Sequence, residues 1–446
     1  MLTAASLVLL MTPGLAMFYG GMNRARGILN MMMMSFGAMA LVGVLWVLYG
    51  YSVAFGPSVG RIVGNPATYF GFEGLLADTA VTAGLPDTVF SAFQLGFAVI
   101  TVALISGAIA DRAKFSAWMI FAGAWATLVY FPVAHWVFAF QAFDDASATY
   151  TDGGWIATHL DTIDLAGGTA VHINAGAAAL ALALVLGRRR GFGAEPMRPN
   201  NLPLVMLGAG LLWFGWFGFN VASTLNVNTF SGYVWINTFV ATGAAMLAWL
   251  LVERLRDGKS TSLGAASGAV AGLVAITPAC GAVTPVGAIF IGLIAGVLCA
   301  FAVGLKYRLK YDDSLDVVGV HLVGGLTGTI LIAFFASESA GYYGLNGLLY
   351  GGGFDLFARQ ITGALAVMVY SFVMAFIIGF VIQKTMGFRI SEEEEQEGID
   401  FTEHAETAYE LLGRPGGAFG ARPSTSPAPA ATVSSTAPTA TTEVSA

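Results

Sequence analysis

The chain has 446 residues, of which 56% are hydrophobic and 11% are charged, with a formal net charge of −7 and a mean hydropathy of +0.73. Soluble globular proteins carry about 25% charged residues, so this composition excludes that class and favours a helical protein that crosses the membrane many times. No feature favours nucleic-acid binding. The two cysteines, Cys280 and Cys299, lack the spacing of a redox or metal site, and we expect no metal and no cofactor.

Eleven apolar segments follow one another along the chain, each close to the roughly 20 residues that a membrane-spanning helix needs. They predict an all-α polytopic membrane protein with eleven transmembrane helices. The first segment has no basic region before it and an arginine-rich loop after it, which is not the pattern of a signal peptide. Because it begins at Met1 without an outer flank, we expect the true start to lie several residues upstream. The predicted spans lie near 1–19, 28–55, 88–110, 115–141, 164–187, 202–222, 233–252, 262–278, 283–305, 316–336 and 360–383.

The basic residues predict the orientation of these spans. All of the 20 Lys and Arg residues except Arg61 and Arg359 lie after odd-numbered spans or after the last span. By the positive-inside rule that side is cytoplasmic, so we expect the N-terminus outside and the C-terminus inside. The acidic loop 141–163, which has no Lys or Arg, fits the outer face.

The composition changes after the last span. We expect a transmembrane domain over residues 1–383, a cytoplasmic C-terminal segment over 384–412 and a disordered tail over 413–446, which is rich in Pro, Ser, Thr and Ala. The acidic run SEEEEQE at 391–397 predicts a solvated face rather than a contact site.

Two of the five histidines lie inside spans, His172 in the fifth and His321 in the tenth. A repeat of five spans is necessarily inverted in the membrane, so these positions predict an inverted five-helix repeat plus one extra helix, with a pathway at the repeat interface. Each histidine follows an aspartate at the start of its span, Asp164 and Asp316. We favour a symmetric pair that faces one pathway, because ionisable groups in the membrane are costly; the alternative is that each histidine packs against a neighbouring helix.

Asp164 lies eight residues before His172, or roughly 12 Å along a helix. We expect it to cap the helix and order the outer mouth; the alternative is a direct cation ligand. Neutral imidazoles could not hold a bare alkali cation in a low-dielectric channel, and the chain has no carbonyl filter of the TVGYG kind.

Aromatic residues gather near the outer halves of the helices. They fit either interfacial belts or a cation–π cup in which Ser223 adds a hydroxyl. Periodicity does not choose between the two. The candidates are Phe93, Phe97, Phe138, Phe217 and Phe219.

Over residues 1 to about 411 the sequence resembles the ammonium transporter (Amt/Mep/Rh) family, of the bacterial Amt type. The resemblance rests on motifs in a fixed order together with the predicted spans and orientation. The motifs are PGLAMFYGGMNRARGILN, FQLGFAVITVALISGAIADR, DLAGGTAVHINAGAAAL, WFGFNVAST, GAASGAVAGLVAITPACGAV, DDSLDVVGVHLVGGLTG and GIDFTEHAETAY.

This resemblance implies a homotrimer with one pore through each subunit. An outer site would recruit ammonium through Phe97, Phe138, Ser223 and Asp164. The stacked pair Phe97 and Phe219 would close the outer end of the pore, and the twin histidines His172 and His321 would line it. Ammonium would lose its proton near the gate and cross as ammonia, with a separate proton relay through the imidazoles as a further hypothesis.

Three positions depart from the family pattern. Phe138 stands where a tryptophan is usual and is a weaker cation–π partner. Leu165 replaces an aromatic residue after the aspartate, and Ala405 replaces a glycine in the C-terminal segment.

The resemblance also implies a non-enzymatic transporter in the cell (plasma) membrane, embedded in the lipid bilayer, that carries ammonium or ammonia and methylammonium. Its C-terminal segment would be regulatory, and a PII-type signalling protein would bind the cytoplasmic face. Three other interpretations compete: a gas channel, an ammonium sensor and a haem redox enzyme that uses His172 and His321 as ligands.

Overall fold

The computed structural model describes residues 1–409 except 76–80, 83, 141–142, 145–148 and 151. The expected disordered tail at 413–446 therefore lies outside the described residues. Helices account for most of the described chain. They are α1 (Leu2–Met22), α2 (Ile28–Leu45), α3 (Tyr51–Phe55), α4 (Asp87–Ile105), α5 (Phe115–Trp125), α6 (Phe131–Phe138), α7 (Asn174–Leu186), α8 (Leu202–Val221), α9 (Thr229–Asp257), α10 (Ser262–Ile276), α11 (Pro285–Ala302), α12 (Leu305–Leu309), α13 (Val323–Phe335), α14 (Asp355–Thr385), α15 (Glu392–Glu397) and α16 (Ile399–His404).

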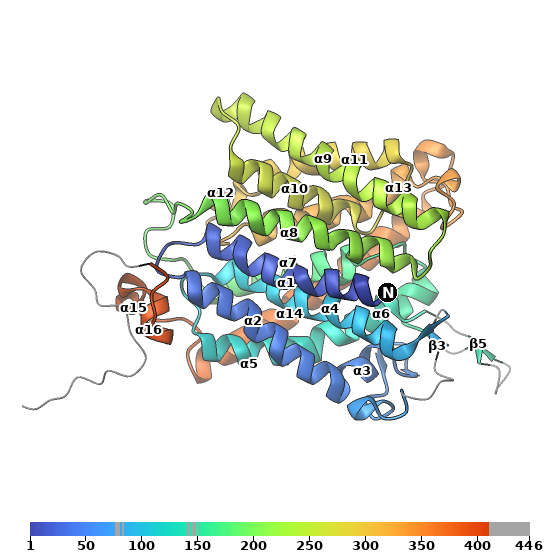
Figure 1. Ribbon diagram of the computed structural model, residues 1–446, viewed down its shortest axis with the longest axis horizontal. Helices are drawn as coiled ribbons and strands as arrows, with labels where there is room; N and C mark the ends of the chain where they lie inside the picture. The colour runs from blue at the N-terminus through green and yellow to red at the C-terminus, as the bar shows by residue number, and fades with distance from the viewer. Residues whose placement is uncertain (76–80, 83, 141–142, 145–148, 151, 410–446) are drawn as a thin grey trace, which may run out of the picture. The chain divides into compact units, whose positions relative to one another are not determined.

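Short 3-10 and π-helical turns and three short antiparallel hairpins accompany these helices. The hairpins are β1 (Ser58–Val59) with β2 (Val63–Gly64), β3 (Val81–Thr82) with β4 (Leu85–Pro86), and β5 (Phe143–Asp144) with β6 (Thr149–Tyr150). β3 and β5 lie at the opposite end of the long helices from α15 and α16 (Figure 1). The loops of the two ends are therefore well separated along the helix direction.

Ten helical segments in the described part of the chain are long and apolar enough to cross a membrane, and they match ten of the eleven predicted spans. The all-helical membrane fold is thus confirmed. The remaining predicted span, near 262–278, corresponds to α10, which is apolar but has only 15 residues. Its composition resembles the other spans, whereas its regular helix ends earlier, in turns at 277–282 that are buried in the protein.

The helices pack in a pattern that brings distant parts of the chain together. α1 packs along α8, and α9 packs against both α10 and α11. α7 and α13 each pack against α14, the last long helix. Small residues permit these close approaches: a side chain at Gly208 would collide with the backbone nitrogen of Phe18. The helices of the two sequence halves therefore interlock and do not form separate bundles.

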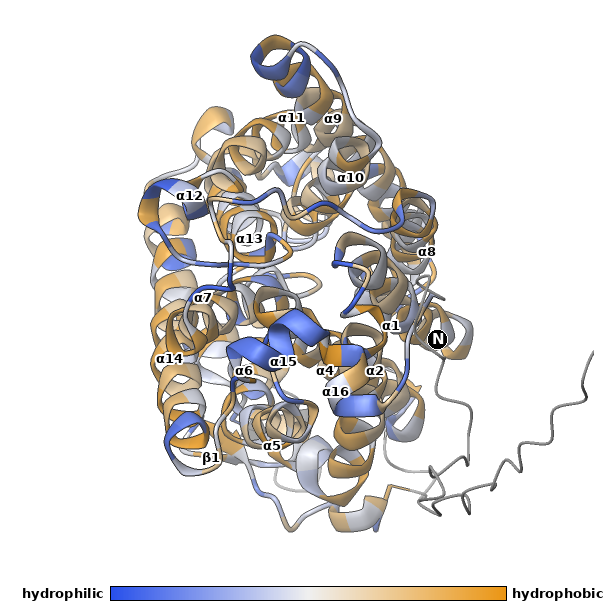
Figure 2. Cartoon of the chain, turned by 90° about the vertical axis from the view of Figure 1, so that its left-hand side faces the viewer, coloured by the Kyte–Doolittle hydropathy of each residue, from blue (hydrophilic) through white to orange (hydrophobic). Residues whose placement is uncertain are grey.

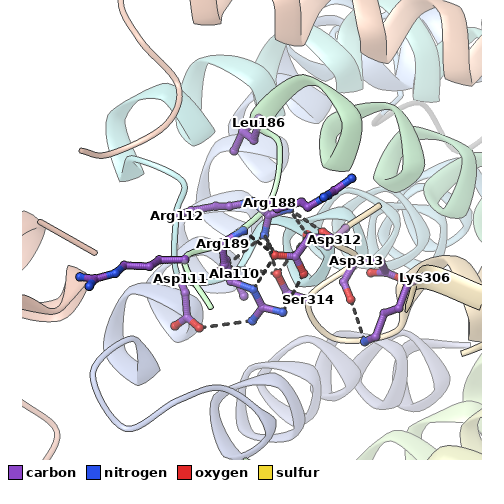
Figure 3. A network of polar contacts seen from close by, with 12 residues as sticks. Ala110, Asp111, Arg112, Leu186, Arg188, Arg189, Lys306, Asp312, Asp313 and Ser314 are labelled. Atoms are coloured by element: carbon purple, nitrogen blue, oxygen red, sulfur yellow. Dashed lines mark hydrogen bonds and ion pairs between the residues drawn. The ribbon is translucent and has the colours of Figure 1, made fainter. Parts of the chain in front are cut away.

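Charged side chains are buried at the end of the bundle that also carries α15 and α16 (Figure 3). Arg189 donates to both carboxylate oxygens of Asp312, at 2.8 and 2.9 Å, and also pairs with Asp111. Arg112 donates to Ser314 and to the carbonyl oxygen of Asp312, both at 2.6 Å. Burial lowers the pKa of Arg112 to about 10, against the opposing effect of Asp312. This network connects the α4–α5 loop, the α7–α8 loop and the loop that follows α12.

The C-terminal segment supplies capping groups to two long helices. The Asp400 carboxylate accepts hydrogen bonds from Leu29 and Asn30 N–H at the start of α2, at 3.0 and 2.8 Å. The Glu403 carboxylate accepts from Phe115 N–H at the start of α5, at 2.9 Å. Neither helix has a side-chain cap from its own N-cap residue. Because the first turn of a helix leaves N–H groups without partners, α2 and α5 depend on this segment.

The prediction of a wholly solvated acidic run is wrong at one position. Glu395 is 7% exposed and pairs with Arg24 at 3.3 Å and Arg389 at 3.2 Å. Glu392 and Glu393 are exposed as expected. The run forms helix α15 with a capping box at Ser391, and helical spacing turns Glu395 inward while its neighbours face outward.

Candidate functional site

The two predicted histidines meet inside the helix bundle. Nδ1 of His172 lies 3.2 Å from Nδ1 of His321, and the ring centroids are 5.3 Å apart. Both side chains are buried. Each histidine lies in a π-helical turn, Gly168–Ile173 before α7 and Val318–Leu322 before α13. Single π-helical turns are frequent at functional sites, and here they occur at corresponding places in the two halves.

The contact between two ring nitrogens restricts the tautomers of the pair. When both imidazoles are neutral, one Nδ1 donates its proton and the other accepts. The donor ring then presents a bare Nε2 that can accept, and the acceptor ring presents an Nε2–H that can donate. Within the described residues, Nε2 of His172 is buried and has no hydrogen-bond partner. The pair therefore holds unused hydrogen-bonding capacity for a small polar molecule.

Asp164 caps the turn that carries His172. Its carboxylate accepts from the N–H groups of Gly167, Gly168, Thr169 and Ala170, at 2.8, 2.7, 2.8 and 3.3 Å. Both oxygens are therefore engaged, in agreement with the predicted cap. The side chain is 6% exposed, so a bound cation would have to compete with four backbone donors.

In the second half the matching aspartate is Asp313, and the pairing of Asp164 with Asp316 is wrong. The Asp313 carboxylate accepts from Val317 and Val318 N–H, at 3.1 and 2.8 Å. Asp313 precedes His321 by eight residues, as Asp164 precedes His172. Asp316 instead has a φ of 64° and pairs with Lys306 at 2.6 Å. Both histidine turns thus begin at a capping carboxylate.

Aromatic rings lie directly beside His172. Phe97 and Phe219 stack with centroids 4.0 Å apart and an interplanar angle of 14°. Phe219 lies 6.3 Å from the His172 ring, so the stack adjoins the histidine pair. Phe138 meets Phe97 edge to face at 6.1 Å and is 6% exposed. The Phe97–Phe219 stack therefore lies between Phe138 and His172 in a chain of ring contacts.

The remaining aromatic candidates divide into two groups. Phe93 contacts Phe97 edge to face at 4.9 Å and is fully buried, so it supports the stack from behind. Phe217 stacks on Trp235 at 4.6 Å, away from the histidines, and Trp235 is 45% exposed. Ser223 is half-buried and donates to the Phe219 carbonyl at 2.8 Å. Its hydroxyl is thus one helical turn from the stacked ring.

Two small cavities flank His321. One is bounded by the two histidines, Phe219 and apolar side chains of α1, α4, α8 and α10. The other runs from His321 past Phe18 and Met22 to Asp316. Each has a volume of about 10 Å³, which is the space of about one water-sized molecule. Each cavity therefore has room for one small molecule and not for a hydrated ion.

Trp216 and Phe18 also line these cavities, although they are not among the site residues predicted from the sequence. Trp216 stacks on His172 at 5.4 Å, and its Nε1–H donates to Thr277 at 2.8 Å. It lies three residues before Phe219 in α8, on the same helical face. This spacing from a predicted site residue could have identified Trp216 in the sequence. Phe18 borders both cavities, but in sequence it is one apolar residue among many in α1.

Comparison with known proteins decides the family. Residues 1–409 match the family model described as Ammonium Transporter Family. The chain belongs to this family. It is 58% identical to an ammonium transporter of Mycobacterium tuberculosis over 92% of this chain and 89% of that protein, and 48% identical to one of Aquifex aeolicus over 92% of both.

Solved structures of related transporters share the fold. Mep2 from Candida albicans matches with a TM-score of 0.79 and 32% identity over 88% of this chain and 85% of that chain. A protein titled Sensor Amt Protein matches with a TM-score of 0.80 and 28% identity over 90% of this chain and 96% of that chain. The chain is therefore a multi-pass membrane transporter for ammonium and not an enzyme.

Replacing Asp164 tests its role as a cap. In Asp164→Ala four backbone N–H groups lose their acceptor, and we expect the free energy of unfolding to fall by about 2 kcal/mol. Asp164→Asn keeps one acceptor oxygen and should lie between the alanine variant and the wild type. Tryptophan fluorescence during thermal unfolding in detergent measures the stabilities of the wild type and the two variants. The control is Asp161→Asn, because the Asp161 side chain is 75% exposed; equal effects at the two positions would refute the capping role.

Proposed function

We propose that the chain conducts ammonia through the path lined by His172 and His321, after ammonium has lost its proton at the aromatic stack. The single observation that carries this proposal is the 3.2 Å contact between two buried imidazoles, which share one water-sized cavity while His321 also borders a second. A bare cation in such a narrow apolar space would cost many kcal/mol. Ammonia is neutral and can exchange hydrogen bonds with the free ring nitrogens. Potassium has no proton to release and would be rejected.

Ammonium would be recruited at the outer end by Phe97, Phe138, Ser223 and Asp164. Aromatic faces attract cations, and a hydroxyl can accept one N–H. The gate would be the stack of Phe97 and Phe219, because rings 4.0 Å apart leave no room between them. Ammonium would pass when these rings turn aside. Asp164 would act through the backbone that it orders and would hold a negative charge near the mouth.

The proposed arrangement in the membrane has eleven spans, counting α10, with an inverted five-helix repeat and one extra helix. The N-terminus would be outside, and the cytoplasmic end would be the one that carries α15 and α16. The distribution of Lys and Arg supports this orientation. The matching caps of Asp164 and Asp313 support the repeat.

We further propose a homotrimer with one pore through each subunit. The C-terminal segment, about residues 384–412, would be regulatory, with a PII-type signalling protein as cytoplasmic partner. Its described part contacts α2 and α5 through Asp400 and Glu403. A partner that displaced it would remove caps from two helices at once.

Uptake of labelled methylammonium into cells tests the histidine path. We expect His172→Ala and His321→Ala each to lower the rate about tenfold or more, since each removes a hydrogen-bonding group from an otherwise apolar path. The double variant should lose little more than either single variant, because the two rings act as a pair. His159→Ala is the matched control, as this histidine lies outside the path. Wild-type rates in both single variants would contradict the proposal.

Currents on ammonium addition to proteoliposomes test the separate proton relay. If the proton released at the gate crosses through the imidazole pair, transport carries net charge and a current accompanies uptake. His172→Ala should then abolish the current. Uptake by the wild type without any current would exclude the relay and leave electroneutral ammonia conduction.

Phe138→Trp tests the outer site. A tryptophan is a better cation–π partner than a phenylalanine, and a whole contact of this kind at an exposed site is worth about 0.5–1 kcal/mol. We therefore expect the apparent affinity for methylammonium to rise by at most about fivefold, with the maximal rate unchanged. Phe140→Trp is the control, because Phe140 is 63% exposed two residues further on. Equal affinities for Phe138→Trp and the wild type would place Phe138 outside the recruitment site.

A further inference from the structure

A cleft of about 530 Å³ opens at the end of the bundle where α15 and α16 lie. Its walls come from the α1–α2 loop, from the α7–α8 loop and from the C-terminal segment at 395–399, with Asp111 between them. In the view onto this end, α15 and α16 lie in front of the helix ends, between α14 and α5 on one side and α1 on the other (Figure 2). This volume is typical of a small-molecule site. None of the residues that line the cleft borders the two cavities beside the histidines.

The carboxylates at the bottom of the cleft are already neutralised. Asp111 pairs with Arg24 at 2.6 Å and with Arg189 at 3.4 Å. Glu395 pairs with Arg24 and Arg389 and also accepts from the Arg190 backbone N–H at 3.0 Å. Because each carboxylate is held by two guanidinium groups, neither presents an uncompensated negative charge to a ligand.

Two arginines of the walls carry no carboxylate partner among the described residues. Arg26 donates from Nη1 to the Gln396 carbonyl at 2.5 Å, and the guanidinium of Arg190 has no partner there. Both side chains are exposed and border the cleft. Gly398 allows the C-terminal segment to pack closely against the α1–α2 loop, because a side chain at this residue would meet Cβ of Arg26 at 2.8 Å. Arg26 and Arg190 thus border one cleft from two different walls.

We propose that this cleft binds an organic phosphate from the cytosol, with Arg26 and Arg190 holding the phosphate group. Guanidinium groups match phosphate oxygens with paired hydrogen bonds. The cleft is far larger than inorganic phosphate, so the ligand carries an organic part. Glu195, the third carboxylate of the lining, has only acceptors and therefore selects hydroxyl or amino donors on that part. A sugar phosphate or a nucleoside monophosphate has this chemistry.

Such a ligand would join the C-terminal segment to two loops. The segment contributes the Gln396 carbonyl that holds Arg26, and it caps α2 and α5 through Asp400 and Glu403. Binding would therefore favour the docked segment. The cytosolic source rests on the orientation proposed above. The histidine variants do not enter the binding assay, so the transport proposal and this one can fail separately.

Calorimetric titration of the full chain in phosphatidylcholine nanodiscs at low salt tests the site. The probes are adenosine 5′-monophosphate, ribose 5-phosphate and inorganic phosphate, with adenosine as the probe that lacks phosphate. We expect saturable binding of the two organic phosphates and none of adenosine. Arg26→Gln and Arg190→Gln should each weaken binding about tenfold or more. Arg198→Gln, an exposed arginine of the α7–α8 loop outside the cleft, should bind as the wild type does.

Glu195→Gln keeps the proposal testable if an arginine variant misfolds. Removing this negative charge should strengthen the binding of inorganic phosphate and reduce the preference for ribose 5-phosphate over it, a gain that misfolding cannot produce. Absence of saturable binding by the wild type, or unchanged binding in both arginine variants, overturns the proposal. Loss of nucleotide binding in phosphatidylglycerol nanodiscs would assign the phosphate to a lipid headgroup and overturn the cytosolic source.

Discussion

The contact between His172 and His321 depends on a general constraint: a polar group buried in a membrane protein has to find its partners within the protein. Nδ1 of each imidazole has Nδ1 of the other as its hydrogen-bond partner, at 3.2 Å. This contact requires the two helices to approach closely at that level, and a side chain at Gly325 would meet Cβ of His172 at 3.1 Å. Trp216 also stacks on His172 at 5.4 Å, and the tilted ring of Phe219 lies 6.3 Å from it.

The same constraint accounts for the carboxylates at the starts of these helices. A helix that begins inside the protein exposes N–H groups that water does not reach. Asp164 and Asp313 accept from those groups for the two histidine turns. Asp400 and Glu403 do the same for α2 and α5, but from a segment more than 280 residues away in the sequence. Capping by carboxylates therefore occurs both beside the histidine pair and where the C-terminal segment docks.

Much of the fold could be predicted because hydrophobic length is a property of the local sequence. Ten predicted spans have matching long helices, and the eleventh corresponds to the shorter α10. The histidine pair could also be inferred, since ionisable groups inside a membrane usually mark a pathway and these two occur at the same span number of each half. The resemblance to the family predicted that Phe97 and Phe219 stack on each other, and their ring centroids lie 4.0 Å apart.

Other features depended on geometry that no local pattern encodes. The choice of Asp313 over Asp316 as the second cap follows from the left-handed backbone at Asp316, which turns its side chain to Lys306. Glu395 is indistinguishable in sequence from the glutamates around it, and only docking of α15 buries it against Arg24 and Arg389. The sequence by itself determined how many apolar segments exist, which of them carry ionisable groups and where the basic loops lie. The tertiary structure decided which carboxylate meets which N–H or guanidinium group, because the fold sets the backbone conformation at Asp316 and brings Glu395 to Arg24, 371 residues away in the sequence.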